Sequence, residues 1–221
     1  MQRVPESEAI AEMKAARQFN QVMGGKFIQE DYARLARDVV EMGVPPTGKV
    51  LDIGTGPGFV AIQVAQRLPE SVRVTGLDLS AAMLAVAAEN ARRAGLNGRV
   101  SWREGNAKAM PFADGEFDFV VSSGSLHHWE DPLAVLNEIA RVLKPGGRCI
   151  VRDSKRLYKL WPKAVAWAIG LLVPPDFRVH YWNSIRSSYT ADELEDLVAQ
   201  SKLEGARVEQ SLLDVMIVKE G

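Results

Sequence analysis

The sequence predicts a single α/β domain built on a largely parallel sheet, and three observations support this. From Lys49 onward, short apolar runs alternate with segments of helical periodicity, a pattern typical of a sheet covered on both faces. A glycine-rich loop follows the first apolar run, and no internal repeat or flexible linker interrupts the chain. The 221 residues are 47% hydrophobic and 25% charged, which suits one globular domain.

The predicted elements follow in order along the chain. Helical spacing from Ile28 to Met42 stops at Gly43 and at the Pro45-Pro46 pair. Strands are predicted at 49–53, 72–79, 99–105, 117–124 and 148–153, with helices at 59–68, 80–94 and 131–143. Ser80 can cap the helix that follows it, because its hydroxyl can accept an exposed backbone N–H. A helix opening at Thr190 (190–202) and strand-like runs at 206–212 and 214–220, close enough for a hairpin, complete the pattern.

We interpret the chain as one domain in four parts. These are an N-terminal helical cap (1–46), a ligand-binding core (47–153), a lid or substrate insertion (154–188), and a C-terminal helix with a strand hairpin (189–221).

Composition excludes several classes of protein. The 27 basic and 28 acidic residues give a net charge of −1, so no nucleic-acid partner is expected. The single cysteine, Cys149, rules out an intrachain disulfide and a metal site with two cysteine ligands. The first twenty residues lack the apolar core of a signal peptide, and the longest apolar stretch, Ala164 to Val173, is too short to span a bilayer. We therefore expect a cytoplasmic protein.

The glycine loop indicates which ligand the sheet binds. Gly54, Gly56 and Gly58 allow the backbone to turn tightly and to approach a ligand closely. A dinucleotide loop requires G-x-G-x-x-G, but here the third glycine comes one residue early and Phe59 follows it. Asp52, at the end of the first strand, would repel a pyrophosphate but suit an ammonium group. Spacing and charge therefore disfavour an NAD-dependent oxidoreductase.

A second carboxylate supports a nucleoside-bearing ligand. Asp78 ends the second predicted strand, twenty residues after Gly58. At that position a carboxylate can accept hydrogen bonds from both hydroxyls of a ribose.

These residues carry a resemblance to a known family. The runs VLDIGTGPG, GLDLSAAML and EGNAKAMPFADGEFDFVVSSGSLHHWEDPLAVLNEIARVLKPGGRCIV resemble the class I S-adenosylmethionine (SAM)-dependent methyltransferases. The nearest subgroup is that of the ubiquinone/menaquinone biosynthesis methyltransferases, and the resemblance covers residues 49–151. It implies a Rossmann-like seven-stranded sheet in the order 3-2-1-4-5-7-6, with strand seven antiparallel and an α-helical lid. It also implies SAM as cofactor and S-adenosylhomocysteine as product.

The resemblance also implies the roles of single residues. The three glycines would form the loop under the methionine part of SAM, with Asp52 near its amino group. Asp78 would bind the ribose and Leu79 would pack on adenine. Asn106-Ala107 matches the place where the family usually has Asp-Ala, so Asn106 is a departure. Its amide oxygen can still accept a bond from the adenine amino group, without charge. Ser123 would lie near the transferring methyl group.

The histidines after the fourth predicted strand are candidates for acid–base chemistry. If the acceptor must lose a proton, His127 can act as a general base. Two alternatives stay open: either histidine can instead hold the loop in place, and a histidine pair can bind a metal. Metal binding is disfavoured, because adjacent residues diverge and no further ligand has suitable spacing. His180 is a weaker candidate for the base.

Residues 154–188 are expected to select the acceptor. Trp161, Trp167, Trp182, Tyr158, Tyr181 and Phe177 offer apolar walls, and Lys155, Arg156, Lys159 and Arg178 offer contacts to an anion. One interpretation is a lid over an aromatic or lipophilic small molecule, which can also be acidic. A second is a helical cap that packs on the sheet edge or on a homodimer partner. A third is peripheral membrane contact through 155–173. The N-terminal helices would close over SAM, with Phe19 and Tyr32 as contacts.

The function predicted from the sequence is methyl transfer from SAM to a small molecule. The rival from another class is a SAM-binding regulatory or accessory protein without catalysis, since the glycine loop and Asp78 would serve both.

Overall fold

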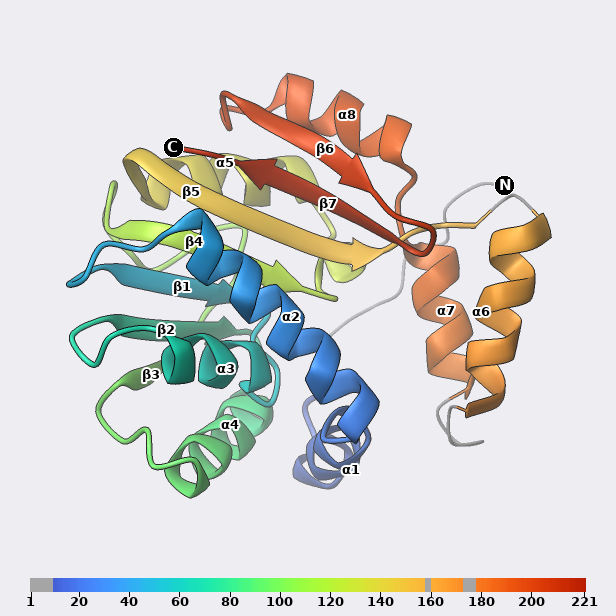
Figure 1. Cartoon of the computed structure of the whole chain (residues 1–221), viewed down its shortest axis with the longest axis horizontal. Helices are drawn as coiled ribbons and strands as arrows, with labels where there is room; N and C mark the ends of the chain where they lie inside the picture. The colour runs from blue at the N-terminus through green and yellow to red at the C-terminus, as the bar shows by residue number, and fades with distance from the viewer. Residues whose placement is uncertain (1–9, 158–159, 173–177) are drawn as a thin grey trace.

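The computed structural model describes residues 10–157, 160–172 and 178–221. Within these residues, seven strands form one sheet in the order β3-β2-β1-β4-β5-β7-β6 (Figure 1). The first five strands run parallel, and β7 is antiparallel to both β5 and β6. The strands are β1 (Lys49–Ile53), β2 (Arg73–Asp78), β3 (Val100–Glu104), β4 (Phe117–Ser123), β5 (Leu143–Ser154), β6 (Ala206–Gln210) and β7 (Asp214–Lys219). The strand order expected from the resemblance is confirmed.

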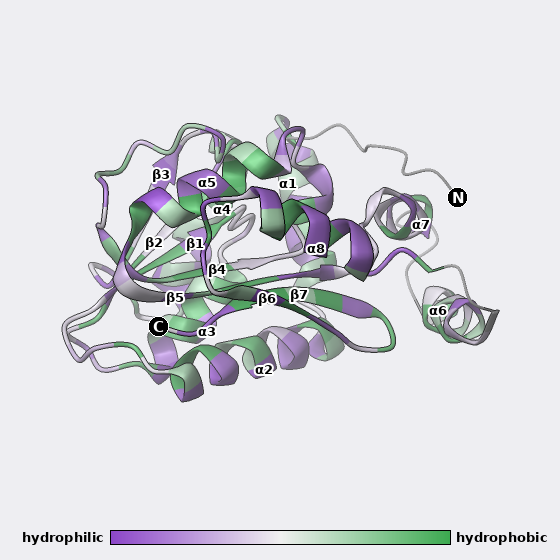
Figure 2. Ribbon diagram, turned by 90° about the horizontal axis from the view of Figure 1, so that it is seen from above, coloured by the Kyte–Doolittle hydropathy of each residue, from purple (hydrophilic) through white to green (hydrophobic). Residues whose placement is uncertain are grey.

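Helices cover both faces of the sheet. Figure 2 shows α2 and α3 on one side of the sheet and α5 and α8 on the other. The helices are α1 (Met13–Met23), α2 (Lys26–Met42), α3 (Phe59–Arg67), α4 (Ala81–Arg93), α5 (Pro132–Val142), α6 (Leu160–Leu172), α7 (Arg178–Ser187) and α8 (Ala191–Gln200), with a 3₁₀ turn η1 (Leu126–His128) after β4.

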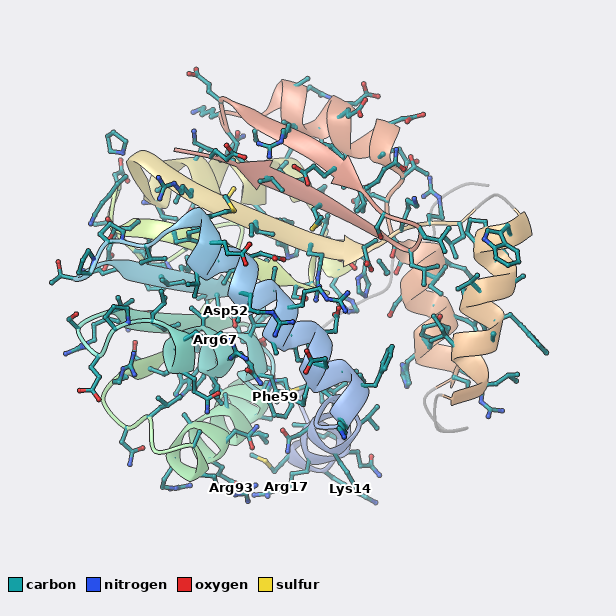
Figure 3. The ribbon with its side chains drawn as sticks, in the orientation of Figure 1. Lys14, Arg17, Asp52, Phe59, Arg67 and Arg93 are labelled. Carbon is teal, nitrogen blue, oxygen red and sulfur yellow. The ribbon has the colours of Figure 1, made fainter. Side chains whose placement is uncertain are left out.

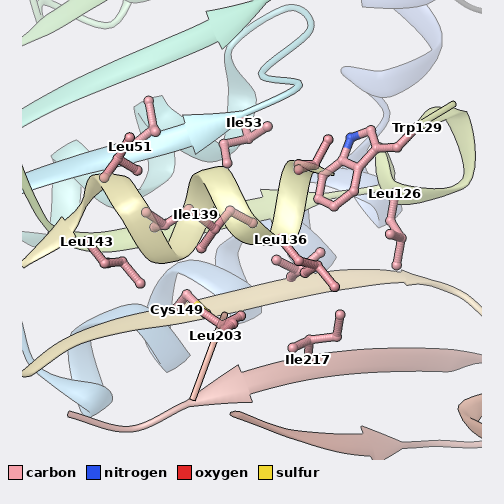
Figure 4. Packing of buried hydrophobic residues seen from close by; sticks show 14 of the residues in the cluster. Leu51, Ile53, Leu126, Trp129, Leu136, Ile139, Leu143, Cys149, Leu203 and Ile217 are labelled. Atoms are coloured by element: carbon pink, nitrogen blue, oxygen red, sulfur yellow. The ribbon is translucent and has the colours of Figure 1, made fainter. Parts of the chain in front are cut away.

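Central strand β4 is buried on both faces, as expected for a parallel sheet between two helical layers. Val120 packs into the cluster under α5 and α8, whereas Phe119 and Val121 pack into the cluster under α2 and α3. Figure 4 shows the first cluster, in which Leu136 and Ile139 of α5 lie against the sheet. These two cores fix the strand ends, and with them the side chains that follow each strand.

Side chains cap the predicted helices that begin at Ser80 and Thr190, and the cap at Ser80 confirms the prediction made for it. The Ser80 hydroxyl accepts the Met83 N–H at 3.1 Å and so caps α4. Thr190 and Glu193 form a capping box at the start of α8, in which each side chain bonds the other residue's backbone.

Strand β5 begins earlier than the sequence predicts. The predicted strand starts at Arg148, but Leu143 already pairs with Phe117, directly after α5 ends. The register shifts between Phe117 and Phe119, which accommodates the extra residues.

Helices α6 and α7 form an extension at one end of the molecule, apart from the layered body in both views (Figures 1 and 2). Its base is held by two backbone hydrogen bonds, from Lys155 to Leu213 and from Arg156 to Tyr189. No helix in the described part of the chain is long and apolar enough to cross a membrane.

Candidate active site

A cavity of about 820 Å³ opens at the carboxyl ends of the parallel strands. This is the position where an open α/β sheet binds its ligands, and the volume is that of an ordinary small-molecule site. Its walls come from the loops after β1, β2, β3, β4 and β5, from α1 and α2, and from α7.

The glycine loop after β1 forms the floor of the cavity. Gly56 has φ of +51°, and a Cβ built on it would meet no atom within 4 Å, so its backbone faces open space. At Gly54 a Cβ would lie 2.4 Å from the Cβ of Ser125. Gly58 does not line the cavity: its Cβ position lies 2.5 Å from the Trp102 ring and 2.9 Å from Ala87. Gly58 therefore belongs to the predicted loop without lining the cavity itself, and its lack of a side chain allows β3 and α4 to pack closely.

Asp52 lies at the end of β1 with 1% of its surface exposed. Its Oδ2 accepts hydrogen bonds from the Thr55 hydroxyl at 2.6 Å and from the Ala61 N–H, at the start of α3, at 3.2 Å. Burial raises the pKa of Asp52 to about 7, against the lowering effect of these two bonds, and the charge of Asp78 raises it further. A cation in the cavity would therefore draw a proton off this carboxyl.

Asp78 is oriented by the backbone around it. Its two carboxylate oxygens accept the N–H of Gly56 at 2.7 Å and the N–H of Ser80 at 2.9 Å. Burial raises its pKa above the usual range, although these bonds oppose the rise. Because each oxygen has more than one lone pair, the carboxylate can accept further bonds from a ligand.

The remaining predicted ligand-binding residues also line the cavity. Leu79 is 50% exposed, as expected for a side chain that lies against an open ligand site. Asn106 Oδ1 accepts the Lys108 N–H at 2.8 Å, so a ligand would use its second lone pair. Ala107 and Ser123 lie in the same wall.

The N-terminal helices close one side of the cavity, as predicted. Phe19 and Tyr32 both line it, and Tyr32 stacks on Phe59 with ring centroids 6.2 Å apart. In Figure 3, Asp52 lies behind α2, and Arg17 lies near the ends of α1 and α4. Arg17 binds Glu89 of α4 at 2.8 Å, which ties α1 to the body. Burial raises the pKa of Tyr32 to about 12, so its hydroxyl is a poor base at neutral pH.

His127 meets a partner that the sequence analysis missed. Its Nδ1 lies 2.8 and 2.9 Å from the two carboxylate oxygens of Asp153, at the end of β5, and its backbone N–H also binds Asp153 Oδ2. Both side chains are buried, and His127 lines the cavity. Burial tends to raise the pKa of Asp153, but the charge and hydrogen bonds of His127 outweigh it and lower the pKa. A neutral His127 that donates from Nδ1 keeps its basic lone pair on Nε2.

A second charged pair lies in the same wall. Arg152 on β5 binds Asp31 of α2 through two hydrogen bonds of 3.2 and 2.6 Å, and it also donates to Ser123 Oγ. Arg152 and Asp153 lie at the carboxyl end of a strand, where an open parallel sheet binds its ligands, so the sequence could have marked both as candidates. Their partners, Asp31 and His127, are far away in sequence.

The extension formed by α6 and α7 contributes only one of its helices to the cavity. His180, Tyr181, Ser184 and Ile185 of α7 line it. Trp161 and Trp167 of α6 are 71% and 60% exposed and do not line the cavity, which disfavours the interpretation in which they wall the acceptor.

The basic side chains predicted to contact an anion bind other groups of the protein instead. Arg156 pairs with Glu193, Lys155 donates to Gln210 at 3.2 Å, and Arg178 donates to the Leu171 carbonyl oxygen, so none is offered to an anion in the cavity. Trp182 is absent from the cavity wall and packs at the α6–α7 contact. Tyr158, Lys159 and Phe177 lie outside the described residues.

The histidine pair does not form part of a metal-binding cluster. Among the described residues no group of three or more His, Cys, Asp or Glu side chains could hold a metal ion.

Comparison with known proteins agrees with this geometry. Residues 51–151 match the family described as a methyltransferase domain. The Ubiquinone/menaquinone biosynthesis C-methyltransferase UbiE of Geotalea daltonii is 34% identical over 126 residues, which cover 57% of this chain and 53% of that protein. The chain thus spans about half the length of the curated relatives it matches.

Solved structures share the fold. A candidate S-adenosyl-L-methionine-dependent methyltransferase from Methanococcus maripaludis has a TM-score of 0.76 at 22% identity, over 99% of this chain and 98% of that one. A phosphoethanolamine N-methyltransferase from Haemonchus contortus, solved with S-adenosyl-L-methionine, has a TM-score of 0.66 at 24% identity, over 90% and 43%. At these identities the likeness concerns the fold alone.

The sheet order, the glycine loop and the match over 51–151 make this part of the chain similar to a class I SAM-dependent methyltransferase domain. Within that class the chain is similar to the ubiquinone/menaquinone C-methyltransferases. The predictions of the fold, of this class and of SAM as its cofactor are confirmed.

Proposed function

We propose that the chain methylates a small aromatic or lipophilic molecule with SAM as the methyl donor. One observation carries the proposal: the glycine loop and Asp78, which suit SAM, line the same cavity as the His127–Asp153 pair, which suits proton removal. We call the ends of β1, β2 and β3 the donor half of the cavity, and the ends of β4 and β5 with η1 and α7 the acceptor half.

The residues of the donor half fit SAM. The backbone of Gly56 leaves open space for the methionine part, and Asp52 offers a negative charge for its ammonium group. Asp78, held by two backbone N–H groups, accepts the ribose hydroxyls. When bound, SAM would supply a methyl group whose carbon an acceptor atom can attack in line with the C–S bond, and the sulfur would leave in neutral S-adenosylhomocysteine.

The residues of the acceptor half can remove a proton from the acceptor. Methyl transfer needs an electron-rich acceptor atom close to the methyl group, with water excluded. His127 would take the acceptor's proton on Nε2 while Asp153 holds the ring and stabilises its positive charge. Asp153 does not itself receive the proton, since its pKa is lowered.

The proposed acceptor class rests on the walls of the acceptor half and on the relatives. Trp129, Tyr181 and Ile185 give this half apolar and aromatic surface. The relatives named for ubiquinone and menaquinone biosynthesis favour a phenolic ring as the acceptor.

Calorimetric titration and a turnover assay test the proposal together. We expect micromolar binding of SAM and S-adenosylhomocysteine with no binding of NADH. With a panel of hydroquinones and alkyl-substituted phenols, we expect formation of S-adenosylhomocysteine and a methylated product by mass spectrometry. Binding without turnover on any acceptor would instead indicate a non-catalytic SAM-binding protein.

A further inference from the structure

The two helices of the extension pack on each other through small residues of α6. A Cβ on Gly170 would lie 3.3 Å from both Tyr181 and Trp182, and the Tyr181 hydroxyl donates to the Ala166 carbonyl oxygen at 3.0 Å. Ala166 and Gly170 are buried. The face of α6 that carries Ala166 and Gly170 is therefore packed against α7.

The opposite face of α6 is apolar and exposed. Lys163, Trp167 and Leu171 follow at intervals of four residues and so lie in one line along the helix. Trp161, Trp167 and Leu171 are 71%, 60% and 51% exposed, although aromatic and aliphatic side chains of this size are usually buried. We call this surface the outer face of α6; its exposed residues are Trp161, Lys163, Ala164, Trp167, Ala168 and Leu171.

Basic residues outnumber acidic ones in the sequence of this segment. Residues 155–188 contain six Lys or Arg residues and one acidic residue, Asp176, whereas the whole chain has 27 basic and 28 acidic residues. The helices α6 and α7 contain no Asp or Glu, and the side chains of Lys163 and Arg186 are exposed. The extension is thus a local basic region on a chain that is neutral overall.

The outer face lies one helix away from the cavity. His180, Tyr181 and Ser184 of α7 line the cavity, and α6 packs on α7. Figure 1 shows α6 as the outermost helix at this end of the molecule. A surface bound to α6 would therefore lie close to the acceptor half.

From these observations we propose that the outer face of α6 binds an anionic lipid bilayer. Tryptophan favours the headgroup region because its ring is apolar and its N–H is polar, and basic side chains are attracted to anionic lipids. A helix bound in this way would lie on the membrane and would not cross it. The inference extends the proposed function, since a lipophilic acceptor would enter the cavity from the bilayer.

A second copy of the chain is a poorer occupant. In a two-fold contact the same surface faces itself, so the exposed charge of Lys163 would lie against a second positively charged surface. The helices of the extension carry no carboxylate to offset this charge.

Vesicle flotation of the full chain tests the proposal. We expect binding to vesicles of phosphatidylglycerol and phosphatidylcholine, weakened by high salt, and little binding to phosphatidylcholine alone. The double variant Trp161→Ala/Trp167→Ala and the variant Lys163→Glu should each lower the partition coefficient about tenfold or more. Lys202→Glu, an exposed charge reversal beyond the end of α8, is the matched control and should bind as the unchanged chain does.

Three results would overturn the proposal. One is no binding to the anionic vesicles, and another is equal binding by the double tryptophan variant. The third is a dimer in analytical ultracentrifugation that the same double variant dissociates, since the outer face would then join two copies. SAM affinity and turnover on soluble acceptors, measured without vesicles, report separately on the proposed function and show that each variant is folded.

Discussion

The donor half of the cavity is built mainly from backbone, whereas the acceptor half is built from side chains on separate elements. In the donor half, Gly56 presents bare backbone, and Asp78 is held by the backbone N–H groups of Gly56, in the loop after β1, and of Ser80. In the acceptor half, His127 depends on Asp153 of the next strand, and Arg152 depends on Asp31 of α2. A backbone-built site tolerates change in its surroundings, but a site of paired side chains is altered by a single substitution.

This difference suits the two ligands. The donor would be the same molecule throughout the class, so its site can be fixed by the turn after β1. Acceptors differ, and their part of the cavity includes α7, which belongs to the extension outside the layered body. We therefore expect substitutions in one half to leave binding in the other half nearly unchanged.

The largest expected effect is on turnover. His127→Ala should lower kcat by roughly 10² to 10⁴-fold, the usual contribution of a general base, with SAM affinity unchanged. Asp153→Asn should lower kcat less and move the acid limb of the kcat profile to lower pH, because the protonated ring loses its anionic neighbour. Steady-state kinetics across pH and calorimetry with SAM provide both readouts.

Unchanged turnover in His127→Ala would contradict the role of general base and would indicate that this histidine only holds the loop in place. A loss of SAM affinity in the same variant would break the separation between the two halves. His180→Ala is the matched control, because this histidine also lines the cavity, and its kcat should stay within a few-fold of the unchanged chain.

The second largest expected effect is on the affinity for SAM. Asp78→Ala should weaken SAM binding by about 100-fold, since each hydrogen bond to a charged group contributes roughly 1.5 to 3 kcal/mol and 1.4 kcal/mol is tenfold. Calorimetry measures the loss, and thermal unfolding checks the fold. Asp78→Asn keeps the shape without the charge and should bind with intermediate affinity. Equal affinity in Asp78→Ala would disprove the ribose assignment.

The same contrast explains what the sequence could predict. The strand order and the donor half depend on local signals: glycines with positive φ, carboxylates at strand ends, and helix caps such as Ser80. The His127–Asp153 and Arg152–Asp31 contacts join residues 26 and 121 positions apart, so no local pattern connects them. Asp153 nevertheless ends a predicted strand, and that signal could have marked it.

The composition of a segment does not fix the direction in which its side chains point. The aromatic content of 154–188 suggested walls for an acceptor, but Trp161 and Trp167 face away from the body because Ala166 and Gly170 provide the close contact with α7. Gly58 fits the glycine pattern, yet it serves the packing of Trp102 and Ala87.

The smallest expected effect is the pH dependence of SAM affinity, which tests the role of Asp52 in the donor half. The pKa of Asp52 is raised to about 7, so below that pH the cavity without ligand holds this carboxyl protonated. If Asp52 accepts the ammonium group of SAM, only its ionised form binds well, and a proton must leave before SAM binds. SAM affinity should therefore fall as pH drops from 7 to 5.5, by up to about tenfold per pH unit, because each unit of pKa corresponds to 1.36 kcal/mol. Asp52→Asn should bind SAM more weakly at pH 7.5 and with a flat profile over this range. A flat profile in the unchanged chain would instead confine Asp52 to holding Thr55 and the start of α3.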